Sequence, residues 1–208
     1  MKYLIAGCLF LLASLSTVAQ TELAVHAGYN HNTASVDIAG KKQSTGYLPG
    51  IHIGGRIKTG FEPPLYFVGM LSYNLRGFVL KPSVGDTSRL EARIHYIDIA
   101  PMLNYDFKLN ANNKIGIIVG PAIGVALSGK QKITEDGATR NEQMKLSFSN
   151  NYGYVNVGIQ AGLNYQFNKM FLEGTYHLGV TSINNNEEFD DTNIKNRGFA
   201  ISLGYWFK

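Results

Sequence analysis

The sequence predicts an all-β protein, an eight-stranded, antiparallel, up-and-down transmembrane β-barrel. Three observations indicate this fold. Apolar side chains recur at every second position in eight segments, which is the period of a β-strand with two unlike faces. Three of these segments end in the same Tyr-x-Phe pattern. Short connections alternate with longer ones, as expected of outer-membrane barrels with short periplasmic turns and longer outer loops.

The chain begins with a segment typical of a secretory signal peptide. Lys2 precedes a long apolar run that ends at Thr17-Val18-Ala19. We therefore predict a signal peptide over residues 1–19 and a barrel domain over residues 20–208. Cys8 lies within the signal, and most of the apolar run follows it, which disfavours lipid attachment. The mature chain would then have no cysteine, so disulfides and thiol catalysis are not expected.

Composition excludes two further classes. The apolar run of the signal is the only long one, which argues against a helical membrane protein. Removal of Lys2 with the signal lowers the formal net charge from +4 to +3, and the remaining basic residues are spread along the chain. No basic run of the kind that binds nucleic acid is present.

The first half of the barrel domain contains four alternating segments. In the first, Leu23 and Val25 oppose Ala24 and His26. Polar or turn-rich stretches at 30–46, 59–64 and 77–89 separate the segments and are predicted loops. The predicted strands cover 23–29, 47–58, 65–76 and a segment that ends with Ile97, Ile99, Leu103, Tyr105 and Phe107.

The second half repeats this pattern, with glycines filling much of the less apolar face. The predicted strands cover 115–128, 152–167, 170–180 and 197–208. They are joined by a turn at 108–113, a long charged loop at 129–151, a tight hairpin at Asn168-Lys169 and an acidic loop at 182–196. The acidic run Glu187–Asp191 lacks the glycine and ligand spacing of a calcium cage, so we predict a solvated loop and no metal site.

The volume of the barrel decides which face is inside. A soluble ligand-binding barrel would place its apolar residues inward. The interior of an eight-stranded barrel is just wide enough to be filled by side chains, and about five bulky apolar residues per strand would overfill it. We therefore expect the apolar face to contact lipid. Pro49, Pro101 and Pro121 also have outward parity, and we expect a bulge or irregular register near each because proline cannot donate to the ladder.

The repeated Tyr-x-Phe endings predict a ring of aromatic residues at one membrane boundary. With an even number of strands, this boundary also carries the short turns and both termini, so we expect both termini in the periplasm. The predicted girdle consists of Tyr105, Phe107, Tyr165, Phe167, Tyr205 and Phe207.

Charged and titratable residues also occur on the inward parity. They could line a binding or conduction path, or they could form a hydrogen-bonded plug, since buried charges need partners. The narrow interior favours the plug, with the predicted ion pairs Arg56–Glu173 and Arg76–Asp98. The inward set comprises His26, His52, Arg56, Arg76, Asp98, Asp106, Glu173 and His177.

No constellation of catalytic residues stands out. Small outer-membrane barrels with lipid-modifying activity need a serine or histidine grouping near the lipid boundary. His95 has outward parity near the outer end of its strand, but the sequence shows no grouping of serine, histidine and acid at comparable depth. We therefore expect no enzymatic activity and no cofactor.

Several stretches resemble the outer-membrane β-barrel domain of Bacteroidetes, whose members are often called porin-like or PorT-like. The resemblance covers nearly the whole mature chain and is densest from Tyr96 onward. It is carried by Tyr96–Tyr105, Gly120–Gly129, Gly153–Tyr165, Tyr176–Ile183 and Asn196–Phe207.

Two features depart from the family pattern. Pro101 falls one place later than expected after Tyr-Ile-Asp-Ile, and Lys208 follows the final aromatic residue. The resemblance implies insertion into the outer membrane through the barrel-assembly machinery, and it supplies no catalytic residues. The leading prediction is a monomeric, non-enzymatic structural or interaction protein with little or no pore. The alternatives are an accessory role in protein secretion, which the PorT-like resemblance suggests, and a soluble ligand-binding barrel.

Overall fold

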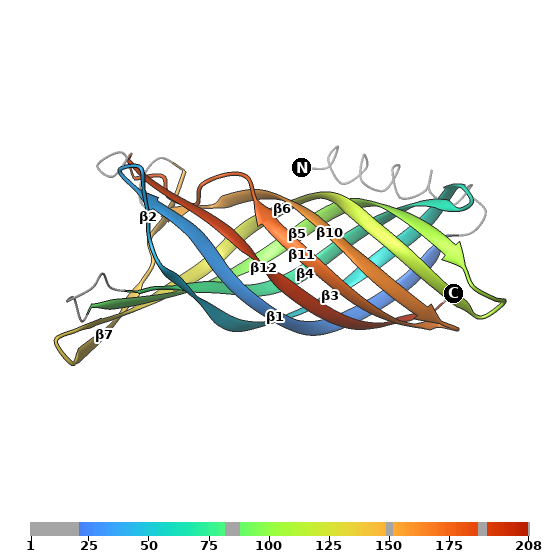
Figure 1. Ribbon diagram of the computed structural model, residues 1–208, viewed down its shortest axis with the longest axis horizontal. Helices are drawn as coiled ribbons and strands as arrows, with labels where there is room; N and C mark the ends of the chain where they lie inside the picture. Colours follow the sequence, from blue (N-terminus) through green and yellow to red (C-terminus); the bar gives the residue numbers. More distant parts are fainter. Residues whose placement is uncertain (1–20, 82–87, 149–151, 187–190, 208) are drawn as a thin grey trace, which may run out of the picture.

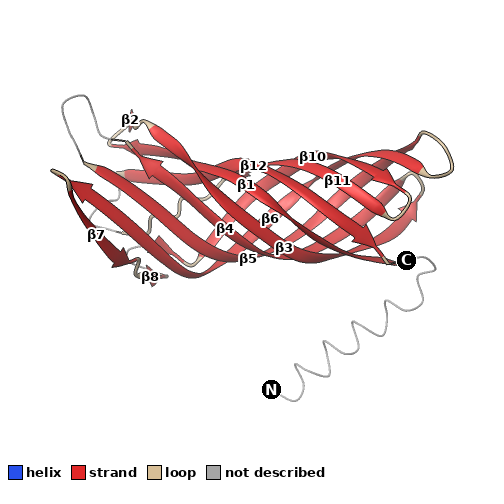
Figure 2. Cartoon of the chain, turned by 90° about the horizontal axis from the view of Figure 1, so that it is seen from below, coloured by secondary structure: helices blue, strands red, loops and turns tan. Residues whose placement is uncertain are grey.

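The computed structural model describes residues 21–81, 88–148, 152–186 and 191–207. The predicted signal peptide, 1–19, lies outside the described residues. No helix in the described ranges is long and apolar enough to cross a membrane. Secondary structure in the described residues consists of strands (Figure 2).

Eight long strands of the described chain form one closed, antiparallel barrel (Figure 1). Each strand pairs with its neighbours in sequence, and β12 pairs with β1 to close the ring. This confirms the predicted fold class. The barrel strands are β1 (Glu22–Ile38), β3 (Thr45–Glu62), β4 (Leu65–Leu80), β5 (Arg89–Lys108), β6 (Asn113–Glu135), β10 (Val155–Phe167), β11 (Met170–Gly179) and β12 (Thr192–Trp206).

Four short strands lie outside this ring. The strand β2 (Lys41–Lys42) pairs with β1, and β7 (Ala138–Gln143) folds back on β6 as a hairpin. The pair β8 (Leu146–Ser147) and β9 (Tyr152–Gly153) is parallel. All four belong to the connections at one end of the barrel, which we call the loop end.

The opposite end, which we call the turn end, carries the short connections. These join β3 to β4, β5 to β6 and β10 to β11. Glu22 begins β1 at this end, and the backbone N–H of Phe207 donates to the carbonyl of Leu23 at 2.8 Å. The tightest turn has Asn168 at φ 53°, a left-handed conformation that asparagine tolerates well. The predicted sorting of short and long connections is therefore present.

The large apolar side chains of the belt point away from the barrel axis. Ile53, Leu163 and Ile201 are each 60% exposed, as expected for residues that contact lipid. The arrangement is the reverse of a soluble ligand-binding barrel, in which these residues would fill the interior. The lipid-facing parity predicted from side-chain volume is therefore correct.

The strands extend well beyond the predicted ends at the loop end. Most of the predicted loops 30–46 and 129–151 is strand, and 192–196 of the predicted loop 182–196 belong to β12. The predicted loop 77–89 begins only after Leu80. The cause, seen clearly in β5, is an inversion of polarity along the strand. In β5, Ile97 and Ile99 face outward, whereas closer to the loop end Ile94 and Tyr96 face inward and Arg93 faces outward. Beyond the membrane the outer face meets water, so the apolar side chains turn inward.

These inward apolar residues form a core that fills the loop end of the barrel. Met144 and Ile183, from the connections, complete this loop-end core. Tyr152 packs against it, and burial raises the pKa of its phenol. The filling of the barrel is therefore polar only in part, because an apolar core, which was not predicted, occupies the loop end. The loop-end core consists of Ala34, Val36, Phe78, Ala92, Ile94, Tyr96, Ala126, Met144, Ile183 and Ile194.

The three outward prolines disturb the ladder in two ways. Near Pro49 the pairing of β3 with β4 shifts between Tyr47 and His52, as predicted. Pro101 and Pro121 lie opposite each other between β5 and β6, where pairing is interrupted from Ile99–Ile123 to Leu103–Val119 without a change of register. The expected register irregularity is absent there. Because neither proline has an N–H, the ladder loses bonds and the strands keep their alignment.

Candidate functional site: the barrel interior

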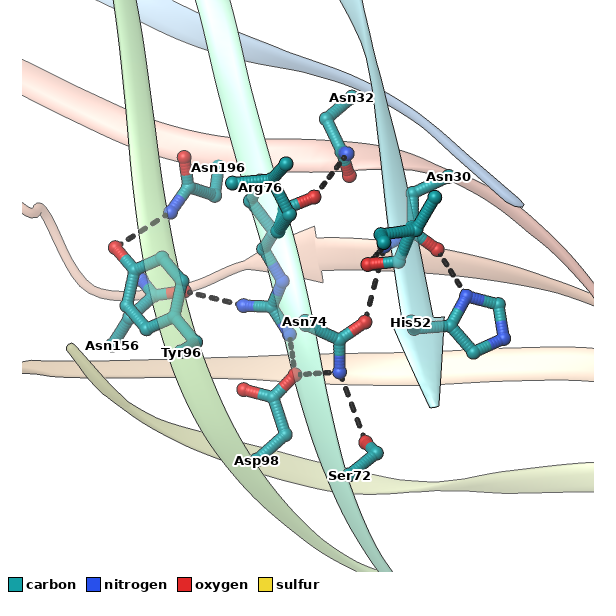
Figure 3. Close-up of polar contacts among 12 residues, drawn as sticks. Asn30, Asn32, His52, Ser72, Asn74, Arg76, Tyr96, Asp98, Asn156 and Asn196 are labelled. Carbon is teal, nitrogen blue, oxygen red and sulfur yellow. Dashed lines mark hydrogen bonds and ion pairs between the residues drawn. The ribbon is translucent and has the colours of Figure 1, made fainter. Parts of the chain in front are cut away.

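A continuous hydrogen-bonded network crosses the middle of the barrel (Figure 3). His52 Nδ1 lies 2.6 Å from Asn30 Oδ1. On the other side of the ring, His52 Nε2 lies 2.7 Å from Ser202 Oγ. An amide oxygen only accepts, so His52 Nδ1 carries the proton. Asn30 donates to Asn74 at 3.1 Å, and Asn74 donates to Asp98 at 2.6 Å. The network links β12, β1, β3, β4 and β5.

Arg76 continues this network to the far wall. It forms the predicted ion pair with Asp98, and its Nη1 donates to Asn156 Oδ1 at 3.4 Å. The guanidinium also lies 5.1 Å from the ring centroid of Tyr96, whose hydroxyl accepts from Asn196 at 3.3 Å. Tyr96 belongs to the loop-end core, so the polar network and the apolar plug share a boundary at this residue.

The second predicted ion pair lies nearer the turn end. Arg56 Nη1 donates to Glu173 Oε2 at 2.8 Å and Nη2 donates to Oε1 at 3.1 Å, a two-pronged contact that fits the planar guanidinium. Both side chains are at most 3% exposed. The guanidinium also stacks 4.4 Å from the Phe171 ring centroid, and Phe171 packs against Trp206. Charge and aromatic packing together block this level of the lumen.

A third ion pair was missed in the sequence. Lys58 Nζ lies 2.5 Å from Asp106 Oδ2, and both residues are buried. Asp106 is among the predicted inward residues, whereas Lys58 is absent from that set. The ammonium also lies 4.2 Å from the Tyr66 ring centroid. The signal for this pair in the sequence is parity, since Lys58 lies two residues after the inward Arg56 on β3.

Two further predicted residues line a small cavity beside the network. His26 lies 5.7 Å from His52, measured between ring centroids, and His177 comes from β11. The cavity has a volume of about 50 Å³. Among the described residues, His26 Nδ1 and both ring nitrogens of His177 have no hydrogen-bond partner. A polar space of this size suits a few ordered waters, which would satisfy these groups.

Inward glycines make room for the larger interior side chains. A Cβ added to Gly28 would lie 2.5 Å from His52 Cε1, and one added to Gly204 would lie 2.0 Å from Phe171 Cζ. Both positions therefore require a residue without a side chain. The glycine-rich inner face recognised in the sequence thus accommodates side chains from neighbouring strands.

The remaining predicted positions lie on the outer surface. The six girdle residues, Tyr105, Phe107, Tyr165, Phe167, Tyr205 and Phe207, are all exposed and all lie at the turn end. His95 also faces outward, where its Nδ1 lies 2.5 Å from the Tyr73 hydroxyl and Ser128 is its register partner on β6.

The structure shows no grouping suited to a metal in the described ranges, where no three His, Cys, Asp or Glu residues converge. Glu187 to Asp190, most of the acidic run weighed as a calcium loop, lie outside the described residues. Chemically, the interior is a set of paired charges and amides held between two aromatic or apolar layers.

Comparison with known proteins gives a family and several structural likenesses. The chain is similar to Ail, the attachment invasion locus protein of Yersinia pestis, in complex with the heparin analogue sucrose octasulfate. Identity is 16% and the TM-score 0.45, over 91% of this chain and 100% of that chain. It is also similar to Neisserial surface protein A, with 12% identity and a TM-score of 0.44 over 90% and 99% of the two chains. For OprG of Pseudomonas aeruginosa, the identity is 11% and the TM-score 0.45, over 89% and 95%.

No curated protein matches the chain. A family model described as an outer membrane protein β-barrel domain matches residues 18–185, which is most of the chain. The matched range includes seven of the eight barrel strands in full. The closed barrel, its lipid-facing belt and this match agree, and the chain belongs to the outer membrane protein β-barrel domain family.

Proposed function

We propose that this outer-membrane protein is a non-conducting barrel that serves a structural or interaction role through its loop end. The filled interior carries the proposal. The loop-end core, the Arg76–Asp98 network and the Arg56–Glu173 pair with Phe171 obstruct three successive levels. An ion or solute would have to displace buried ion pairs and an apolar core to pass. The inward polar residues then act as a plug.

The proposed orientation places both termini in the periplasm. The short connections lie at the same end as the start of β1 and the end of β12. Outer-membrane barrels generally have short periplasmic turns and longer outer loops. The loop end, with its hairpin β6–β7, would then face the exterior. The expected partners are outer-membrane lipid and, during insertion, the barrel-assembly machinery, and we expect a monomer.

We also propose that the protein is not an enzyme. His95 is the histidine best placed for chemistry at the membrane surface, and its Nδ1 is bonded to the Tyr73 hydroxyl. Ser128 is its register partner, but no carboxylate is within bonding distance of the His95 ring among the described residues. A nucleophile, base and orienting acid are therefore not assembled here.

Liposome swelling tests the absence of a pore. We expect liposomes containing the refolded protein to swell in small sugars no faster than protein-free liposomes. A general porin in matched liposomes supplies the positive control. The shift in gel mobility between heated and unheated samples confirms that the barrel is folded. Swelling at a rate comparable to the porin would overturn the proposal.

The resemblance to PorT-like proteins of Bacteroidetes suggests an accessory role in secretion, and this stays a prediction. A deletion strain that retains cargo inside the cell, and exports it again when the gene is restored, would support it. Unchanged export would eliminate it.

A further inference from the structure

A pair of like charges faces outward where the apolar belt ends at the loop end. Arg93 on β5 and Lys130 on β6 are direct register partners, so their side chains project from the same face of the sheet. Lys132 lies two residues further along β6 on that face. Like charges placed directly opposite each other destabilise a sheet. A neighbouring anion would remove this cost.

The protein itself supplies little negative charge to this pair. Among the described residues, neither Arg93 nor Lys130 forms an ion pair. Glu91 lies on the same face, opposite Lys132 in register, and is bound to Arg89 at 2.8 Å. The guanidinium of Arg93 donates through Nη1 to the carbonyl of Pro49 at 3.3 Å, which fixes it across β4 and leaves its other donors available in the described chain.

Another lysine pair shows how the fold neutralises such an arrangement elsewhere. Lys108 and Lys114 are also direct register partners between β5 and β6, at the turn end. There, Lys114 Nζ lies 3.9 Å from Asp106 Oδ2. At the loop end the corresponding carboxylate, Glu91, is bound to Arg89 and forms no ion pair with Arg93 or Lys130 in the described chain.

The position of the pair indicates the source of the missing anion. Directly below it on the outer face are His95 and then Ile97, and Leu127 on β6 is 56% exposed in the lipid-facing belt. The two cations therefore stand at the depth of the lipid headgroups. An arginine fork next to a lysine matches the charge and geometry of a phosphate group.

We propose that Arg93 and Lys130, with Lys132 beside them, form a binding site for the phosphate of an anionic lipid in the leaflet at the loop end. The bound lipid neutralises the opposed cations and anchors the barrel at that membrane boundary. The site is independent of whether the lumen conducts, because every residue in it faces outward.

The test measures retention of phosphorylated lipid by the intact barrel. The protein is transferred from nanodiscs of phosphatidylcholine mixed with phosphatidic acid into detergent, and bound lipids are counted by native mass spectrometry. We expect the wild-type protein to retain phosphatidic acid in preference to phosphatidylcholine. The double variant Arg93→Gln with Lys130→Gln should weaken this preference about tenfold or more, because two charge-assisted contacts are lost.

The matched control removes the same charge from a site away from the belt. Lys41 and Lys42 form the exposed strand β2 at the tip of the β1–β3 connection. The double variant Lys41→Gln with Lys42→Gln should retain phosphatidic acid as the wild type does. An equal loss in both double variants would show general charge attraction and overturn the proposed site.

A second variant tests the like-charge argument. Lys130→Glu should abolish the preference for phosphatidic acid and, in pure phosphatidylcholine nanodiscs, raise the unfolding temperature above that of the wild type, because the glutamate pairs with Arg93. Unchanged lipid preference in this variant would contradict the proposal.

Inorganic phosphate distinguishes the two sources of the anion. We expect millimolar phosphate to displace phosphatidic acid poorly, since the lipid is held in the plane of the membrane. Displacement at low concentration, dependent on Arg93 and Lys130, would overturn the lipid assignment in favour of a site for a soluble anion.

Discussion

The buried pair of Arg56 and Glu173 predicts a specific pattern of stability changes. Removal of either partner leaves an uncompensated charge in the lumen. We expect Arg56→Ala and Glu173→Ala each to lower the free energy of unfolding by about 3–5 kcal/mol. Replacing both residues with methionine should cost less than either single change, since no charge is stranded. Trp206, the one tryptophan of the sequence, packs on Phe171 beside this pair and reports unfolding by fluorescence in a urea titration.

Unchanged stability of the two alanine variants would contradict this prediction. If each alanine variant unfolds at the same urea concentration as the wild type, then the two charges are hydrated in the lumen and the plug is open to water. Loss of the pair would then have little effect, as for an exposed ion pair.

The close contact between Gly204 and Phe171 predicts that a side chain at position 204 destabilises the barrel. A methyl group at this position would lie 2.0 Å from Phe171 Cζ, whereas at Gly174 it would meet no atom within 4 Å. We expect Gly204→Ala to destabilise the barrel by about 1–3 kcal/mol through overpacking. Gly174 faces outward, so Gly174→Ala serves as the control and should not lower the free energy of unfolding. Equal effects of the two variants, in the same urea titration, would show that Phe171 does not fill the space beside Gly204.

Parity in the sequence was enough to predict two of the three buried ion pairs. Arg56, Glu173, Arg76 and Asp98 lie in segments whose alternation is unbroken, so their depth could be counted from the turns. Parity also predicted an inward His52, but its partner Asn30 could not be identified in the same way. Asn30 falls in a stretch rich in polar residues that resembles a loop, and only the closed barrel shows that it points into the lumen.

At the scale of whole strands, the inversion of polarity explains both the correct and the incorrect predictions. Within the membrane the apolar residues face outward and alternate with small or polar ones. In β5 the alternation continues past His95, but Leu90, Ala92 and Ile94 now face inward. The period survives while the apolar face changes sides. A search for alternation alone would therefore have found this part of β5. A search for an apolar face that always points outward misses it.

The hairpin of β6 and β7 predicts a tolerant region. All six residues of β7 are exposed, and Gln131 and Glu142 are register partners joined by a 2.9 Å hydrogen bond. We expect replacement of residues 132–141 by Asn-Gly, which favours a two-residue hairpin turn, to leave the barrel folded. The free energy of unfolding in neutral lipid should change by less than about 1 kcal/mol, as for other exposed segments.

The hairpin can be shortened only as far as Met144. Its side chain packs in the loop-end core, so the shortened hairpin must retain it. A large loss of stability on shortening, with Met144 still present, would mean that the distal hairpin supports the barrel and does not merely extend from it.

For the molecule as a whole, the sequence established the barrel and its lipid-facing side, whereas the filling of the barrel required the structure. Volume arguments excluded the belt residues from the lumen, and the exposed Ile53 and Ile201 agree. The same arguments left open which residues fill the loop end. Ile183 joins that core from the connection between β11 and β12, whose sequence shows no regular period. A connection that folds over the mouth of the barrel leaves no alternating pattern in the sequence.

The central claim is that the apolar face contacts lipid while Trp206 faces a filled lumen, and quenching by brominated lipid tests it most directly. Trp206 is 6% exposed and Ile201 is 60% exposed on the same strand. In vesicles of dibrominated phosphatidylcholine, we expect wild-type Trp206 to keep most of its fluorescence. The double variant Ile201→Trp with Trp206→Phe should be strongly quenched. Strong quenching of wild-type Trp206, with little quenching of the double variant, would contradict the account.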